Sequence, residues 1–330
     1  MIRFGIIGTS WITEEFIRCA KRYPDFVISA VYSRSPQKAS EFAEKVGAAH
    51  TFDDLTAMAE SDLIDAVYIA SPNSLHAEQS ILFMEHKKHV LCEKSASANV
   101  KELMAMIEAA KRNQVAFMEA MISTLQPGMQ AMKKNLAKLG KIRRYFGSYC
   151  QYSSRYDAYK AGVYNNTFNP DFANGALMDL GVYCIYPLVY LFGKPEAILA
   201  SAVKLPSGVD GETALICQYK DMDAVIMCSK ITASAADCEI QGETGTMAFS
   251  TVNQISKVEI RYNDRQKSAE SVDFEPTDAY MYFEAKEFME MIKEKRIESA
   301  ENSFQLALDV RAVMDEVRRQ IGLSFPNDAK

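Results

Sequence analysis

Short apolar segments alternate with amphipathic ones through the first 120 residues, and this alternation restricts the fold more than any other feature of the chain. Buried strands are expected at 2–8, 26–33, 66–72, 89–94 and 115–121. The stretches between most of them have the spacing of helices, and the stretch before residue 66 is expected to be a polar loop. Strands that alternate with helices of about 10–15 residues indicate parallel βαβ units in a doubly wound sheet. Right-handed crossovers in such a sheet leave a ligand crevice at the carboxyl ends of the strands.

The pattern changes after roughly residue 125. A helix-like stretch at 129–140 is followed by seven strand-like runs with short turns, which predicts a large, open and mainly antiparallel sheet. Two further helices are expected at about 280–295 and 303–321. Because 330 residues are too many for one compact core, we expect an α/β domain at 1–122 and an α+β domain at 123–330. The C-terminal helix could pack back on the first domain.

The sequence FGIIGTSWIT, residues 4–13, joins the first expected strand to the first helix. This is where a dinucleotide-binding loop directs its backbone N–H groups toward a pyrophosphate. Gly8 supplies the tight turn, while Ser10 and Thr13 occupy the second and third small positions of the G-x-G-x-x-G/A pattern. A glycine in such a connection is often only a turn, but its place at the start of the βαβ series favours a nucleotide site.

The end of the second strand indicates which nucleotide. NAD is usually selected by an acidic residue there, which binds the ribose 2′-hydroxyl. This chain instead has the hydroxyl of Ser33 and the cations Arg34 and Lys38. A planar guanidinium suits a 2′-phosphate, so NADP is favoured, with NAD possible. The alternative is a basic surface turn that begins a helix.

Three further motifs follow: SPNSLH at 71–76, Glu-Lys at 93–94, and D-x-G-x-Y in Asp179, Gly181 and Tyr183. Together with Gly8 and in this order, they resemble the Gfo/Idh/MocA oxidoreductases over almost the whole chain. The likeness is greatest to the subgroup of dimeric dihydrodiol dehydrogenases and glucose-fructose oxidoreductase. That family joins an N-terminal Rossmann domain to a C-terminal domain built on an open, mainly antiparallel sheet, which binds the substrate and forms dimers.

The resemblance assigns roles by position. Lys94 matches the active-site lysine of the family and Tyr183 its acid/base tyrosine, while Asp179 would bind substrate hydroxyls or orient Lys94. Glu93 would contact the nicotinamide ribose. The expected cofactor-binding residues are Gly8, Thr9, Ser10, Trp11, Ile12, Ser33, Arg34, Lys38, Ser71, Pro72, Asn73, His76, Glu93 and Lys94.

These roles make a coherent reaction. Moving a hydride between nicotinamide and a carbon that bears oxygen requires a proton transfer at that oxygen. A free phenol, with a pKa of ~10, is a weak acid–base group near neutral pH, and a nearby ammonium would favour the phenolate. All four histidines, at positions 50, 76, 86 and 89, lie in the first half of the chain, so the second domain cannot supply a histidine base. Asp179 and Tyr183 are one helical turn apart and share a face.

The chain departs from the family in two places. Ser95 follows Lys94 where relatives usually have a proline, and the stretch 119–129 lacks the aromatic residue and the arginine of dihydrodiol-type relatives. We therefore expect an altered substrate pocket. Trp11 is expected to pack beneath the dinucleotide, or alternatively to be a core aromatic of the first helical turn.

Composition excludes other classes. A net charge of -6 argues against nucleic acid or an anionic membrane as the partner, and no apolar run is expected to approach a membrane span of ~20 residues. Seven scattered cysteines and the absence of a signal-peptide pattern fit reduced thiols in a cytoplasmic protein, with no metal spacing.

The sequence therefore predicts an NAD(P)-dependent oxidoreductase acting on a sugar, polyol or diol-like small molecule, as a homodimer formed through the C-terminal sheet. The alternative is a protein that binds the dinucleotide as a sensor or regulator without turnover. The identity of the substrate is left open.

Overall fold

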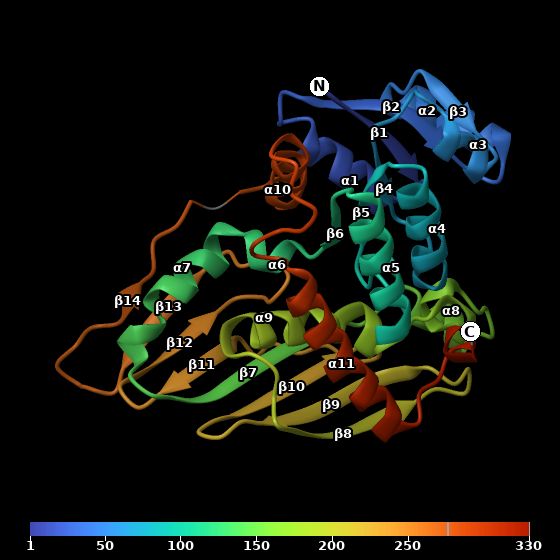
Figure 1. Cartoon of the computed structure of the whole chain (residues 1–330). Helices are drawn as coiled ribbons and strands as arrows, with labels where there is room; N and C mark the ends of the chain where they lie inside the picture. Colours follow the sequence, from blue (N-terminus) through green and yellow to red (C-terminus); the bar gives the residue numbers. More distant parts are fainter. Residues whose placement is uncertain (276, 330) are drawn as a thin grey trace. The chain divides into compact units, whose positions relative to one another are not determined.

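The computed structural model describes residues 1–275 and 277–329. The chain forms two compact units, each with its own sheet (Figure 1). The first unit consists of residues 1–121 and 278–304, and the second of residues 122–277 and 305–330. The first unit is thus built from two pieces of chain that are far apart in sequence.

The first unit contains a six-stranded sheet in the order β3-β2-β1-β4-β5-β6, and every pair in it is parallel. Successive strands are added on one side of β1 up to β3 and on its other side from β4 onward, which is the doubly wound arrangement expected from the sequence. Its strands are β1 (Ile2–Ile7), β2 (Phe26–Tyr32), β3 (His50–Phe52), β4 (Ala66–Ile69), β5 (His89–Glu93) and β6 (Phe117–Ala120).

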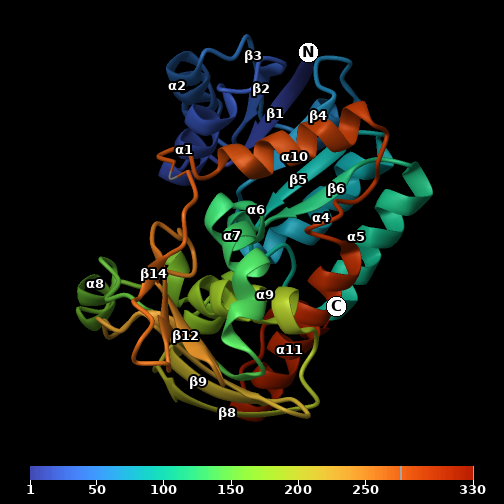
Figure 2. The same ribbon diagram turned by 90° about the vertical axis from the view of Figure 1, so that its left-hand side faces the viewer.

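Helices connect these strands: α1 (Trp11–Ala20), α2 (Pro36–Val46), α3 (Leu55–Glu60), α4 (Asn73–Glu85) and α5 (Val100–Asn113). A further helix, α10 (Tyr282–Lys293), comes from the end of the chain and packs against α1 (Figure 2). Aromatic rings fill the space between them, with the Phe4 ring 4.8 Å from that of Phe26 and 6.1 Å from that of Phe288 on α10. The late segment therefore completes the core of the first unit.

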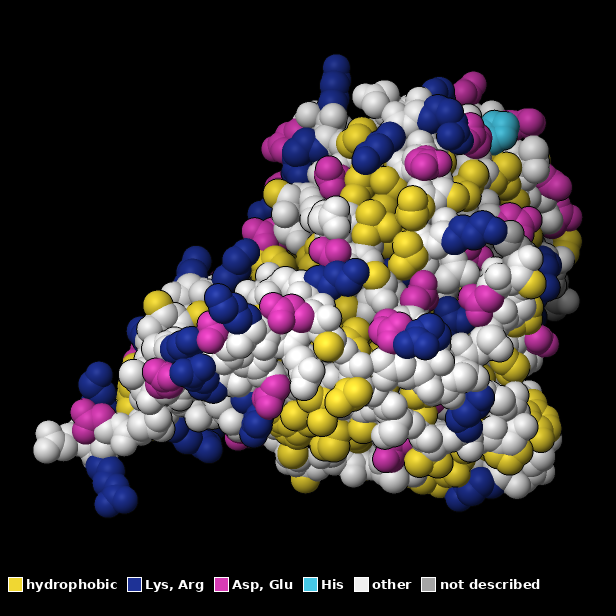
Figure 3. All heavy atoms as spheres, turned by 60° about the horizontal axis from the view of Figure 1, so that its bottom comes forward, with side chains coloured by type: hydrophobic (Ala, Val, Ile, Leu, Met, Phe, Trp, Pro, Cys, Tyr) yellow, Lys and Arg dark blue, Asp and Glu magenta, His cyan; other side chains and the backbone are white. Residues whose placement is uncertain are grey.

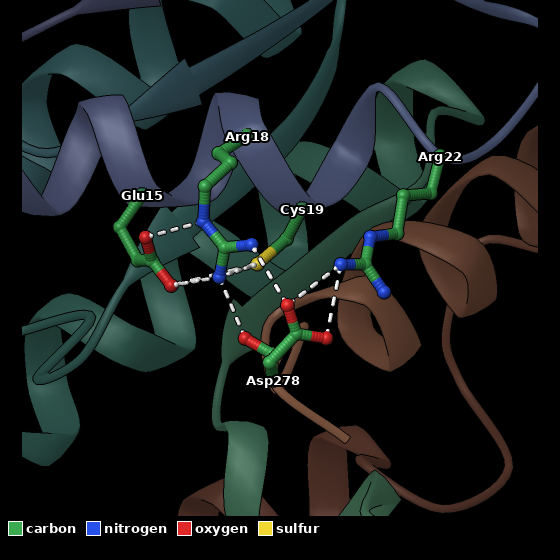
Figure 4. Close-up of polar contacts among 5 residues, drawn as sticks. All are labelled: Glu15, Arg18, Cys19, Arg22 and Asp278. Carbon is green, nitrogen blue, oxygen red and sulfur yellow. Dashed lines mark hydrogen bonds and ion pairs between the residues drawn. The ribbon is translucent and has the colours of Figure 1, made fainter.

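Asp278 is the point at which the chain re-enters the first unit, and two arginines of the α1 region hold it there (Figure 4). Arg22 donates to both carboxylate oxygens at 2.9 Å, and Arg18 donates to the Asp278 backbone carbonyl at 2.6 Å. Glu15 in turn accepts two hydrogen bonds from Arg18. The hydrogen bond from Arg22, with the charges of both arginines, lowers the pKa of the Asp278 carboxyl.

The second unit contains an eight-stranded sheet in the order β14-β13-β12-β11-β7-β10-β9-β8. All of its pairs are antiparallel except β10 with β7, which are parallel. Its strands are β7 (Ile142–Cys150), β8 (Ala197–Lys204), β9 (Asp210–Gln218), β10 (Asp223–Ser229), β11 (Cys238–Gly242), β12 (Gly245–Phe249), β13 (Val258–Tyr262) and β14 (Glu270–Ser271). The mainly antiparallel sheet predicted from the sequence is confirmed.

The helices of this unit are α6 (Ile122–Leu125), α7 (Pro127–Asn135), α8 (Tyr156–Lys160), α9 (Val182–Phe192) and α11 (Phe304–Ile321), with a π-helical turn, Leu177–Gly181, directly before α9. Helix α9 packs on β7 and β10 (Figure 1). The buried Tyr145 of β7 donates its hydroxyl hydrogen bond to the Cys184 carbonyl of α9 at 3.1 Å. The segment that carries Asp179 and Tyr183 is therefore fixed to the middle of the sheet.

The segment Pro170–Phe192 is long and apolar enough to cross a membrane by length and composition, and 72% of its most apolar window is buried inside the protein. The expectation that no apolar run approaches that length is wrong for this segment. The apolar residues of α9 pack on β7 and β10, and the core helix of a globular domain meets the same criterion of length and composition.

The outer face of the second sheet carries a row of apolar side chains, Leu199, Ile216, Val225 and Phe146, that are paired across four neighbouring strands. Leu199 is 60% exposed and Ile216 is 42% exposed. In Figure 3 hydrophobic side chains gather on the lower part of the face in view, among charged ones. The homodimer expected to form through this sheet stays a prediction.

Among the short elements that differ from the expectations are β3, α3 and β14. The segment expected to be a polar loop before β4 contains the three-residue strand β3 and the six-residue helix α3. The two-residue strand β14 was also not expected. All three are too short, and β3 too exposed, to show a clear hydrophobic period.

Candidate functional site

Gly8 directly follows β1 and lies against Ala70, the residue after β4, and its backbone requires glycine. Its φ is +103°, and a Cβ atom there would be 2.4 Å from the Ala70 carbonyl oxygen. Ser10 follows with an extended backbone and precedes α1, while Thr13 is fully buried. The loop thus presents the N-terminal end of α1 at the carboxyl edge of the sheet, as a dinucleotide site requires.

Trp11 begins α1 and is 67% exposed. The alternative that it is a core aromatic of the first turn is therefore wrong. A large indole exposed beside the glycine loop is available to a ligand, and packing against the dinucleotide stays a prediction.

The end of β2 is followed by an N-cap. Ser35 accepts a hydrogen bond from the Lys38 backbone N–H at 3.4 Å, and Ser33 accepts one from the Ser35 N–H at 3.3 Å. Arg34 and Lys38 are both exposed. A cavity of about 360 Å³ opens next to them, lined by Thr9, Glu14, Lys38, Glu41, Phe42 and Lys45.

His76 is 1% exposed and joins two loops of the first unit. One ring nitrogen is 2.8 Å from the Ser71 carbonyl oxygen, and the other is 2.9 Å from the Ser95 carbonyl oxygen. The Ser71 hydroxyl donates to Gln79 Oε1 at 2.7 Å. The imidazole therefore sets the positions of Ser71 and Ser95, which follow β4 and β5.

Glu93 and Lys94 lie at the carboxyl end of β5. The buried Glu93 accepts a hydrogen bond from the Tyr68 hydroxyl at 2.6 Å and one from the Lys94 backbone N–H at 3.2 Å. Burial raises the pKa of the Glu93 carboxyl, and these two partners oppose the rise. Ser95, fully buried, follows Lys94 through a cis peptide bond. Lys94 is thus placed by a buried strand end rather than by a free loop.

Asp179 lies in the π-helical turn and Tyr183 in the first turn of α9. The Tyr183 ring packs edge-on against Tyr149 of β7, with 5.7 Å between the centroids. Asp179 forms an ion pair with Lys230, whose side chain is only 7% exposed. Single π-helical turns are rare and frequent at functional sites. The Asp179 carboxylate, which belongs to an otherwise apolar segment, is therefore charge-paired within the second unit.

Asp210, at the start of β9, is fully buried beneath the same turn. Its Oδ2 accepts hydrogen bonds from the Leu177 N–H and the Thr213 hydroxyl, both at 2.7 Å. Burial raises the pKa of Asp210 to about 6. Gly175 passes directly over it, with φ +140° and only 2.1 Å between an ideal Cβ position and Asp210 Oδ1.

The expected residues fall into two groups. The first unit contains the glycine loop, the end of β2, the 71–76 loop and Glu93–Lys94, whereas the second contains Asp179 and Tyr183. Sequence reasoning missed Lys230 and Asp210. One signal was present: Lys230 is a charged residue inside the run 223–232 that was expected to be a strand, and Asp210 lies three residues before the expected strand 213–219.

The described residues, 1–275 and 277–329, contain no group of three or more His, Cys, Asp or Glu side chains that could hold a metal ion. All seven cysteines are free thiols.

Comparison with known proteins identifies the chain's relatives. Residues 2–121 match the GFO_IDH_MocA model, described as an oxidoreductase family with an NAD-binding Rossmann fold, and residues 129–248 match the GFO/IDH/MocA C-terminal domain. The chain is 52% identical to scyllo-inositol 2-dehydrogenase (NADP(+)) IolU of Bacillus subtilis, over 99% of both chains. It is 28% identical to trans-1,2-dihydrobenzene-1,2-diol dehydrogenase of Danio rerio, over 100% of this chain and 99% of that one. Among solved structures, the 3-ketoreductase KijD10 of Actinomadura kijaniata, in complex with NADP and TDP-benzene, shares the fold with a TM-score of 0.86 at 22% identity, over 97% of this chain and 98% of that one.

Proposed function

The chain belongs to the Gfo/Idh/MocA family of oxidoreductases, and from this membership we propose that it is an NADP-dependent dehydrogenase of polyols or sugars, with scyllo-inositol as the first candidate substrate. It acts on CH–OH groups and transfers a hydride between nicotinamide and the carbon of a hydroxyl or carbonyl group. The observation that carries the proposal is the 52% identity over 99% of the chain to a scyllo-inositol dehydrogenase.

The residues of the first unit fit a dinucleotide. Gly8 permits the close approach of a ligand to the backbone. The cavity beside β2 offers the Thr9 hydroxyl and the Lys38 ammonium, next to the ion pair between Lys45 and Glu14. Ser33 and Arg34 occupy the position where a carboxylate would select NAD. We propose that Arg34 and Lys38 bind the 2′-phosphate of NADP. The other proposed cofactor contacts are Gly8, Thr9, Ser10, Trp11, Ile12, Ser33, Ser71, Pro72, Asn73, Glu93 and Lys94, with His76 acting through the loops that it joins.

Three side chains would serve the reaction itself. When bound, the nicotinamide supplies the hydride acceptor or donor. Tyr183 moves the proton at the substrate oxygen, and the Lys94 ammonium favours its phenolate form. Asp179, as an ionised carboxylate, accepts hydrogen bonds from neighbouring hydroxyls of the substrate.

An assay of both cofactors tests the function. The protein should reduce NADP+ in the presence of scyllo-inositol or a related polyol, and NAD+ more slowly.

Arg34→Ala should weaken NADPH binding by about 1–3 kcal/mol, the range for a lost charge-assisted contact, and barely change NADH binding. Arg112→Ala is the matched control, because this arginine of α5 pairs with Glu85 at the surface. Equal losses for NADPH and NADH would show that Arg34 does not bind the phosphate.

The second candidate is a sensor that binds the dinucleotide without turnover. The presence of both Lys94 and Tyr183 favours the enzyme, whereas Ser10 and Ser95 depart from the family pattern. Tight NADPH binding with no change in absorbance across a broad panel of polyols, sugars and dicarbonyls would favour the sensor.

We further propose a homodimer in the cytoplasm, formed through the outer face of the second sheet. The exposed Leu199, Val203 and Ile216 on β8 and β9 would be covered by the same face of a second chain. Light scattering at micromolar concentration should give twice the chain mass, and Ile216→Asp should shift the mass toward that of one chain. A monomer mass for the unaltered protein would contradict this assembly.

A further inference from the structure

A buried lysine is unusual unless a negative charge accompanies it. Lys230 follows β10 directly, and its backbone is fixed on both sides. Its N–H donates to the Gly211 carbonyl at 2.8 Å, and its carbonyl accepts from the Ser153 N–H at 2.9 Å. With the backbone held in this way, the side chain extends under the π-helical turn, where its ammonium meets the Asp179 carboxylate. The backbone of the lysine is therefore fixed, and its ammonium forms an ion pair with Asp179.

Asp179 is the more exposed member of the pair, at 31% against 7% for Lys230. An unpaired aspartate with this exposure could rotate about χ1 and χ2 and point its oxygens in several directions. The contact of Lys230 Nζ with Asp179 Oδ2 restricts that rotation. The lysine thereby restrains the carboxylate, while 31% of the Asp179 side chain stays exposed.

The turn that carries Asp179 is also fixed from below. Asp210 Oδ2 accepts the Leu177 N–H at 2.7 Å, two residues before Asp179, and Gly175 lies against Asp210 Oδ1. Lys230 acts electrostatically on Asp210 as well as on Asp179. The backbone of the turn and the side chain of Asp179 are thus held by separate contacts, and Lys230 provides an ion pair at the carboxylate.

We infer that Lys230 is a positioning residue for substrate recognition, which holds the Asp179 carboxylate in the orientation that accepts hydrogen bonds from polyol hydroxyls. Lys230 does not itself contact the substrate. The inference rests on the proposed function, in which Asp179 binds those hydroxyls. It assigns a recognition role to a residue outside the D-x-G-x-Y motif, contributed by a strand end about 50 residues later in the chain.

Steady-state kinetics of Lys230→Met, Asp179→Asn and the double variant test this role with a polyol that the unaltered protein oxidises. Lys230→Met should raise KM by roughly 10–100-fold, the range for a lost charge-assisted hydrogen bond, and change kcat by less than about fivefold, because the proton-transfer group is untouched. The double variant should be no worse than Asp179→Asn, since both changes remove one contact. Lys230→Arg, which keeps the charge, should recover part of the loss in KM. NADPH affinity should be unchanged in all of them.

Lys138→Met is the matched control, because its ion pair with Glu270 is exposed in the same unit and takes no part in the site. A Lys230→Met protein that melts at a lower temperature but retains its KM would overturn the inference, as would losses that multiply in the double variant. If the unaltered protein oxidises no polyol, the proposed function fails. A thermal-unfolding cycle of the same variants tests the positioning contact separately from the proposed function: coupling between Asp179 and Lys230 supports the contact, and additive effects overturn the inference.

Discussion

Tyr183→Phe is expected to lower turnover by roughly 10²–10⁴-fold, the usual contribution of general acid–base catalysis. The substitution removes only the hydroxyl and keeps the ring that packs edge-on against Tyr149, 5.7 Å away. NADPH affinity should hold, because the proposed cofactor residues belong to the first unit and Tyr183 to the second. Stopped assays with a confirmed polyol substrate, together with cofactor titration, measure the two quantities separately.

Tyr190→Phe is the control on the same helix. Its hydroxyl accepts hydrogen bonds from Gln130 and Lys133, at 3.0 and 2.8 Å, and has no proposed part in the reaction.

Lys94→Met should also lose most of its turnover. The double variant Tyr183→Phe/Lys94→Met should lose far less than the product of the two single losses, because the effects of residues that act as a unit are not additive. Turnover of Tyr183→Phe within a few-fold of the unaltered protein would make the phenol structural, and the acid–base group would then be sought in Lys94.

Asp210→Asn should change how stability depends on pH. Burial raises the pKa of Asp210 to about 6 in the folded chain, against about 4 for an unfolded aspartate. The folded state therefore holds the proton more tightly, so this group stabilises the fold below about pH 4, and that contribution is lost as the pH rises through about 6. The loss amounts to about 3 kcal/mol. Asparagine keeps an oxygen for the Leu177 N–H without this titration.

Urea unfolding of both proteins between about pH 4 and pH 7 measures the effect. The unaltered protein should lose about 3 kcal/mol of unfolding free energy across this range because Asp210 ionises. Asp210→Asn does not undergo this loss, so its unfolding free energy minus that of the unaltered protein should rise by the same amount. Asp221→Asn is the control, because this aspartate is exposed and pairs with Lys141 at the surface. A difference between Asp210→Asn and the unaltered protein that stays constant with pH would show that the Asp210 carboxyl does not titrate in this way.

The fold was predictable from the sequence because its two halves use different hydrophobic periods. Long amphipathic segments such as 99–113 and 303–321 repeat their apolar residues often enough to define a helix. The helices α5 and α11 begin and end within one residue of these predicted bounds. The short buried strands between helices led in the same way to the parallel sheet. Elements of two or three residues, such as β3 and β14, carry no period and depend on their neighbours for pairing.

The candidate site was only partly predictable, because a motif fixes residues that are close in sequence. Asp179 and Tyr183 share one motif, and the structure places both on one π-turn and helix segment. Lys230 and Asp210 reach the same turn from two different strands, and no spacing rule connects them to it. For Trp11, the sequence predicted the position beside the glycine loop. Its exposure could not be predicted, because that depends on how α1 packs on the sheet.

The discontinuous first unit constrains the order of events during synthesis. Its sheet is fully translated by residue 121, yet α10 and the Asp278 contact with Arg18 and Arg22 lie beyond residue 277. At the translation rate of about 5–20 residues per second, roughly 8–30 s separate these two points. During that time the apolar surface around Phe4 and Phe16 that α10 later covers is open on the ribosome. A nascent chain of this protein therefore has a period in which its first sheet is a target for chaperones, and that period ends only when almost the whole polypeptide has been made.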